Sequence, residues 1–164
     1  MKKYIFLVTF VLMIVFIASN MSYEQQTIVP ELQTILKDKP FEEELSKIEL
    51  TYWDMPISVE TRGYYYFIEF LIRKATHFSG FGLIGVIFFL FYRKMKFRFP
   101  AYFAIASVFI LGSLDEYRQK MQPGRTGLFE DVMIDTAGAI FFVFLAKLFL
   151  WLLSNRKRVS KRPV

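Results

Sequence analysis

Four long apolar blocks dominate this sequence of 164 residues, and each is close to the length that crosses a lipid bilayer as a helix. A bilayer core takes about 17–25 apolar residues in helical form. The blocks span residues 4–20, 67–92, 99–115 and 132–153. Hydrophobic residues make up 54% of the chain, more than an ordinary soluble domain carries. The sequence therefore predicts an all-α protein, with four transmembrane helices bundled in a single membrane domain.

The first block has a second interpretation. Lys2 and Lys3, the apolar run and the small pair Ala18-Ser19 follow the order of a cleaved secretory signal peptide. The residues near Ala18 make a poor cleavage site, which favours a retained membrane anchor. The sequence leaves cleavage open.

Basic residues flank the apolar blocks in three segments: the N-terminus, the link between the second and third blocks, and the tail 154–164. None of these segments contains an acidic residue. The positive-inside rule assigns such segments to the cytoplasm, so both termini are predicted to be cytoplasmic. The net charge of +6 then reflects membrane topology, and no nucleic-acid partner is expected. The residues are Lys2, Lys3, Arg93, Lys94, Lys96, Arg98, Arg156, Lys157, Arg158, Lys161 and Arg162.

The segment 21–66 is acidic, with nine Asp and Glu against four Lys and Arg, and is predicted to lie outside the cytoplasm. Apolar residues recur at helical spacing from Val29 to Leu36 and from Phe41 to Leu50. Two short amphipathic helices are expected there, followed by an extended piece from Ile57 to Val59. The alternative is a solvated acidic loop. The chain has no cysteine, which excludes a disulfide framework and a thiolate metal site.

Charged residues interrupt the outer end of the second block, where a charge within hydrocarbon costs about 2.5–3.5 kcal/mol. Glu69 and Arg73 are four residues apart and are predicted to form an ion pair. Lys74 and His77 are three apart and share a helical face. His77 is the only histidine, and a lone histidine is more often a core residue than a reactive one.

The polar hairpin 115–131 joins the third and fourth blocks and contains charges of both signs. Asp115 and Glu116 lie four and three residues before Gln119, so helical spacing places all three on neighbouring positions. Pro123-Gly124 predicts a turn, with Arg125 at its end.

Two acids follow at the start of the fourth block. Asp131 suits the positive end of a helix dipole, and Asp135 lies one turn further in. Because an apolar run follows Asp135, its carboxylate needs a buried partner. Arg125 or Lys74 is expected to supply it.

These motifs together resemble the VanZ-like family, which is named for a bacterial membrane protein associated with teicoplanin resistance. The matching stretches are R-K-A-T-H-F at 73–78, D-E-Y-R-Q-K-M-Q-P-G-R at 115–125 and D-V-M-I-D-T-A-G at 131–138, with a weaker match at 22–26. The chain departs from the pattern at Ser79-Gly80-Phe81 and at Asp135. The resemblance implies a multi-pass protein of the bacterial plasma membrane. It marks Lys74, His77, Asp115, Glu116, Gln119, Arg125 and Asp131 as family motif positions.

One functional hypothesis is a protein that acts at the outer leaflet on a membrane lipid or a lipid-linked peptidoglycan precursor, with a link to glycopeptide resistance. Lys74 and Arg125 would hold a lipid phosphate, because guanidinium and ammonium groups bind phosphate oxygens. Gln119, Asp131 and Asp135 would orient these cations or contact a head group.

The second hypothesis is a lipid-modifying enzyme that hydrolyses or transfers a phosphoester or acyl group. His77 would act as a general base or nucleophile tuned by Asp115 or Glu116. Alternatively, Asp115, Glu116, Asp131 and Asp135 would hold a hard cation such as Mg²⁺. A third reading makes the charges a purely structural polar network. The sequence leaves the oligomeric state open.

Overall fold

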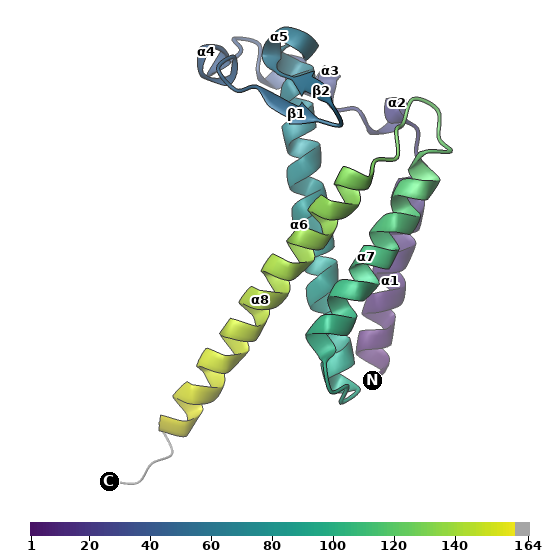
Figure 1. Ribbon diagram of the computed structural model, residues 1–164, viewed down its shortest axis with the longest axis vertical. Helices are drawn as coiled ribbons and strands as arrows, with labels where there is room; N and C mark the ends of the chain where they lie inside the picture. The colour runs from purple at the N-terminus through teal and green to yellow at the C-terminus, as the bar shows by residue number, and fades with distance from the viewer. Residues whose placement is uncertain (160–164) are drawn as a thin grey trace.

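The long helices pack together in an elongated structure in which α8 diverges from the others toward its C-terminal end, and the small elements gather at the opposite end (Figure 1). This computed structural model describes residues 1–159, with side chains through Arg156. Helix α6 contacts each of the other long helices. The long helices are α1 (Lys2–Ser19), α6 (Tyr64–Lys94), α7 (Pro100–Gln119) and α8 (Phe129–Val159). The small elements are α2 (Tyr23–Gln26), α3 (Val29–Ile35), α4 (Glu42–Leu45), β1 (Leu50–Tyr52), β2 (Met55–Ile57) and α5 (Val59–Arg62).

The fold is mostly helical, as predicted. Within the described residues, three helices are long and apolar enough to cross a membrane, namely Lys2–Ser19, Tyr64–Lys94 and Phe129–Arg156. Helix α7 has 20 residues, but charged side chains occupy its last turns. A membrane crossing by α7 remains a prediction.

Each long helix extends beyond the apolar run that predicted it. Helix α6 begins three residues before residue 67, directly after Gly63, whose φ of 82° is one that glycine adopts without strain. Helix α7 continues to Gln119, so residues 115–119 of the predicted hairpin are helical. Helix α8 begins at Phe129 rather than at 132. At the end of α7, Asp115, Glu116 and Gln119 continue the helix because their side chains find hydrogen-bond partners.

The core lies where α6, α7 and α8 meet, and the valines of α1 pack on its edge. Small residues allow α6 and α8 to approach closely. A methyl group built on Gly85 would lie 3.0 Å from Cβ of Ala139. One built on Gly138 would overlap the carbonyl oxygen of Phe78. The core residues are Phe81, Ile84, Phe88, Phe89, Ala104, Val108, Ala139 and Val143.

The segment between α1 and α6 is only partly helical. The predicted helix at 29–36 is present as α3, but the one at 41–50 is wrong beyond Leu45. Leu50 instead begins an antiparallel hairpin in which Tyr52 pairs with Met55. Trp53 and Asp54 form its two-residue turn with φ of 50° and 55°, the sign that tight hairpins require at both positions. The predicted extended piece at 57–59 is present at Ile57, which ends β2, and at Ser58, whose backbone is extended, but Val59 begins α5.

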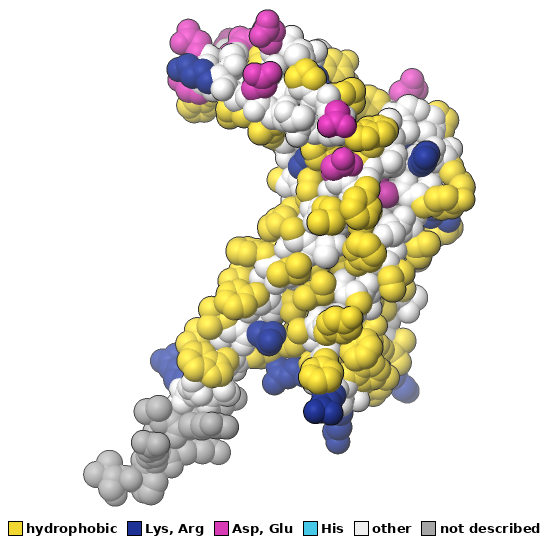
Figure 2. Space-filling view, viewed as in Figure 1, with side chains coloured by type: hydrophobic (Ala, Val, Ile, Leu, Met, Phe, Trp, Pro, Cys, Tyr) yellow, Lys and Arg dark blue, Asp and Glu magenta, His cyan; other side chains and the backbone are white. Residues whose placement is uncertain are grey.

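Acidic side chains are segregated toward one end of the bundle, whereas basic side chains occur at both ends. Figure 2 shows Lys and Arg side chains at the lower end of the visible face, with no Asp or Glu among them, whereas most acids lie at the upper end. Lys161 and Arg162 of the predicted basic tail lie outside the described residues, as do the side chains of Lys157 and Arg158.

Candidate functional site

Glu69, in the first third of α6, ties the segment after α1 to the bundle. Its Oε1 accepts hydrogen bonds from Arg73 at 3.3 Å and from the backbone N–H of Ile28 at 3.0 Å. Its Oε2 accepts one from the hydroxyl of Tyr23 at 2.6 Å. The predicted Glu69–Arg73 ion pair is confirmed. Burial of Tyr23, and then its hydrogen bond to Glu69, raise the pKa of the Tyr23 phenol.

One turn along α6, Lys74 pairs with Asp131 at the start of α8. The β-hairpin adds Tyr52, whose hydroxyl donates to the same oxygen, Asp131 Oδ1, at 2.6 Å. Lys74 Nζ also lies over the Tyr52 ring, 4.2 Å from its centre, a favourable cation–π contact. Burial, and then the bond to Asp131, raise the pKa of Tyr52. Asp131 is therefore a partner in a network joining α6, α8 and β1, and more than a helix-start acid.

His77 is the partner of Asp135, and the expectation that Arg125 or Lys74 would be is wrong. His77 Nδ1 lies 3.0 Å from Asp135 Oδ1, and Asp135 is fully buried. Lys74 lies about one turn before His77 on α6 and reaches Asp131 instead. The second oxygen, Asp135 Oδ2, is buried without a hydrogen bond from the described residues.

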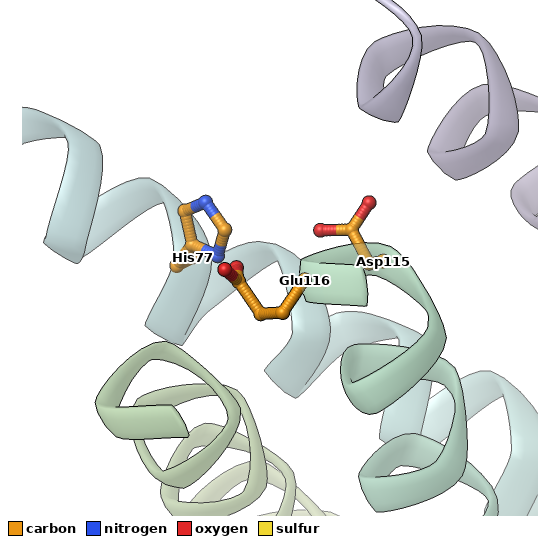
Figure 3. Close-up of side chains that lie close together, drawn as sticks. All are labelled: His77, Asp115 and Glu116. Carbon is orange, nitrogen blue, oxygen red and sulfur yellow. The ribbon is translucent and has the colours of Figure 1, made fainter. Parts of the chain in front are cut away.

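Asp115 and Glu116, near the end of α7, lie beside His77 of α6 (Figure 3). One ligand atom from each of the three residues lies within 4.8 Å of the other two. Asp115 accepts a hydrogen bond from Gln119 Nε2. Glu116 Oε2 accepts one from the backbone N–H of Leu128 at 2.9 Å, which fixes the end of the α7–α8 loop.

Arg125 lies in that loop and contacts neutral groups. Its Nη1 donates to Gln26 Oε1 at 2.8 Å, and its Nη2 donates to Gln119 Oε1. Arg73 Nη1 donates to the same Gln26 oxygen at 3.5 Å, so two guanidinium groups share one amide. Burial, with the nearby charge of Arg73, lowers the pKa of Arg125. Within the described part of the chain, Arg125 forms no salt bridge.

Two cavities meet at these residues. One of about 450 Å³ is largely apolar and lies between α1 and α6, with Ile14, Val15 and Ile84 in its wall. The other, of about 210 Å³, is more polar and is lined by Tyr52, Lys74 and Asp131 among others. Five side chains line both cavities: Glu69, Arg73, His77, Gln119 and Arg125.

All eight residues proposed from the sequence gather at one end of the bundle, but not as one group. The four acids suggested for Mg²⁺ are divided, because Asp131 pairs with Lys74 and Asp135 with His77. The residue that lies beside Asp115 and Glu116 is His77, and not Asp131 or Asp135.

Five contacting residues had no functional role in the sequence-based hypotheses. Glu69 and Arg73 were assigned only their ion pair, and Tyr23 and Gln26 fall in the weakly matching stretch 22–26. Tyr52 carried no signal, since 79 residues separate it from Asp131.

Comparison with known proteins agrees with the motifs. The model of the VanZ/LLP1 family matches residues 4–150. No curated protein matches the chain, and no solved structure matches it. Because the family match spans all four long helices and the whole polar end of the bundle, the chain belongs to the VanZ/LLP1 family.

Proposed function

We propose that this VanZ-family protein binds a lipid-linked phosphate of the bacterial cell envelope at the outer leaflet of the plasma membrane. The observation that carries the proposal is the junction of an apolar and a polar cavity at Arg73 and Arg125. An amphiphile needs such a junction, with room for a chain on one side and a charged group on the other.

The charge of Arg125 supports an anionic ligand. Arg125 is half-buried, and a charged group withdrawn from water is usually paired, yet its partners are the amides of Gln26 and Gln119 and the carbonyl of Met21. Arg73 lies close enough to share the Gln26 oxygen. Two guanidinium groups so placed suit a phosphate, which accepts two parallel hydrogen bonds from each fork.

The larger cavity supports a hydrocarbon chain. Its volume of about 450 Å³ falls within the about 300–1,000 Å³ of small-molecule sites. Ile14 and Val15 of α1 face Ile84 of α6 across it. This role requires that α1 be retained, and its valines do pack against the core.

The topology proposed with this function has four membrane crossings, through α1, α6, α7 and α8, with cytoplasmic termini. Its support is the charge segregation of Figure 2, with basic side chains at the end opposite the cavities. The exposed apolar side chains of α7, among them Tyr102, Phe109 and Ile110, suit contact with lipid.

Binding by the purified full chain in detergent tests the proposal. Native mass spectrometry would compare undecaprenyl phosphate, undecaprenol and inorganic phosphate. We expect the lipid phosphate to bind most tightly. Arg125→Gln should weaken it about tenfold to 100-fold, because a hydrogen bond to a charged group contributes about 1.5–3 kcal/mol. Arg98→Gln, an exposed change at the opposite end, should bind like wild type.

Equal binding of undecaprenol and undecaprenyl phosphate would refute the phosphate role, and free phosphate binding as tightly as the lipid would refute the lipid role. A link to teicoplanin is tested by expression in a susceptible strain, where His77→Ala should abolish any protection.

The His77–Asp135 contact favours a second candidate, a lipid-modifying enzyme. A histidine held by a buried carboxylate is the arrangement of a general base. Lipid extracts from cells with and without expression separate the two candidates. A changed phospholipid or undecaprenyl species would favour catalysis, and unchanged extracts would favour binding alone.

A further inference from the structure

The acids around His77 exceed the positive charge that faces them. Asp115, Glu116 and Asp135 are 5%, 4% and 0% exposed. Within the described residues, Asp115 and Glu116 form no salt bridge, and Asp135 pairs with His77 alone. Three buried carboxylates therefore surround one imidazole. Buried charge without a partner is costly, so such a cluster requires either protons or a cation.

An unsatisfied oxygen lies within this cluster. Glu116 Oε1 is buried and has no hydrogen-bond partner among the described residues. In Figure 3 the Glu116 carboxylate points toward His77. Its other oxygen is already used by the N–H of Leu128. Support of the α7–α8 loop therefore explains the position of Glu116 Oε2, whereas Glu116 Oε1 is left to contact a ligand.

We propose that His77, Asp115 and Glu116 form a binding site for a divalent transition-metal cation. Each offers a ligand atom within 4.8 Å of the other two, a spacing at which one ion can contact all three. One imidazole nitrogen and two carboxylate oxygens make a donor set that Zn²⁺ accepts, with three protein ligands and a remaining open position. The imidazole distinguishes this set from the all-oxygen sites that Mg²⁺ and Ca²⁺ prefer.

The position of the site gives the cation access to the lipid cavity. His77 and Asp115 line the apolar cavity, and Arg125 lines it as well. A cation there would add positive charge beside the two guanidinium groups, where a phosphate is proposed to bind. The proposal of a cation site rests on the three buried carboxylates around His77 and does not depend on lipid binding.

Metal binding by the purified full chain tests this proposal, and the composition makes the test clean. The chain has one histidine and no cysteine, so His77 is the only imidazole and no thiolate competes. The protein would be purified through a tag without histidine, stripped with chelator and titrated calorimetrically with ZnCl₂ or MnCl₂ alone. We expect one cation per chain, and visible absorption bands of the Co²⁺-loaded protein that His77→Gln removes.

Glu116→Gln is the decisive variant, because its amide oxygen can still accept from Leu128 while the charge is lost. It should lower Zn²⁺ affinity by more than the about 10–100-fold that loss of a supporting group costs. Asp115→Asn, which keeps an acceptor for Gln119, gives a second reading if Glu116→Gln folds poorly. Glu130→Gln, an acid at the same end of the bundle but outside the cluster, should bind like wild type.

Two results would overturn the proposal. One is a wild-type chain that binds neither Zn²⁺ nor Mn²⁺ stoichiometrically, with a higher melting temperature in Glu116→Gln; protons would then neutralise the cluster. The other is Zn²⁺ binding that Glu116→Gln and Asp115→Asn both leave unchanged.

Discussion

Gly138→Ala should destabilise the bundle, whereas the same change at Gly80 should not. Gly138 faces the backbone of α6, where an added methyl carbon would overlap the carbonyl oxygen of Phe78 and lie 2.8 Å from its carbonyl carbon. Backbone atoms cannot rotate away, so the two helices must separate. Overpacking of this kind costs about 1–3 kcal/mol.

Gly80 provides the matched control, because a methyl group built there meets nothing within 4 Å. Both variants gain the same helix propensity, about 0.5–1 kcal/mol for alanine over glycine. That gain cancels in the comparison. The difference between the two variants therefore isolates the steric cost, about 1–3 kcal/mol.

Reversible unfolding in mixed dodecyl sulfate micelles, followed by tryptophan fluorescence, would measure this difference. We expect Gly80→Ala to unfold at or above the wild-type midpoint and Gly138→Ala well below it. Equal midpoints for the two variants would refute the close approach of α8 to Phe78.

Three further predictions concern the polar end and the topology. Tyr52→Phe removes the hydroxyl that donates to Asp131. A hydrogen bond to a charged group contributes about 1.5–3 kcal/mol, so its loss should speed proteolysis of the β-hairpin. An unchanged proteolysis rate would contradict that hydrogen bond. Glu69→Gln weakens the anchor of residues 21–36, so hydrogen exchange there should accelerate, while the exposed Glu24→Gln should have no effect. Because the chain lacks cysteine, Glu43→Cys and Lys96→Cys report topology directly. An impermeant maleimide should label only the first in intact cells, and the reverse pattern would contradict the proposed orientation.

The sequence predicted those features that depend on spacing within one helix. The apolar runs located the long helices, and the four-residue spacing of Glu69 and Arg73 gave their ion pair. Helix ends were less accurate, because α7 continues through polar residues to Gln119. The length of an apolar run reflects the thickness of the bilayer core. Helix α7 continues past that run because Asp115 and Glu116 find hydrogen-bond partners.

Pairings between helices could not be predicted in the same way. The partner of Asp135 depends on how far α6 and α8 are rotated and shifted against each other, which one sequence does not encode locally. The β-hairpin was missed because Trp53-Asp54 is not one of the Gly- or Asn-containing pairs that usually announce such a turn. Because the hairpin was not predicted, the contact between Tyr52 and Asp131 could not be predicted either.

The α7–α8 loop is held at both ends by the acids of α7. Asp115 accepts from Gln119, which in turn accepts from Arg125, and Glu116 accepts from Leu128. A ligand that draws on the Asp115 carboxylate therefore alters the support of the Arg125 guanidinium, which reaches Asp115 through Gln119. Thermodynamic linkage makes any such influence mutual: if a cation at the acids changes the affinity of Arg125 for an anion, the anion changes the affinity of the acids for the cation by the same factor. Cation binding at the acids would then change the anion affinity of Arg125 without any movement of the long helices.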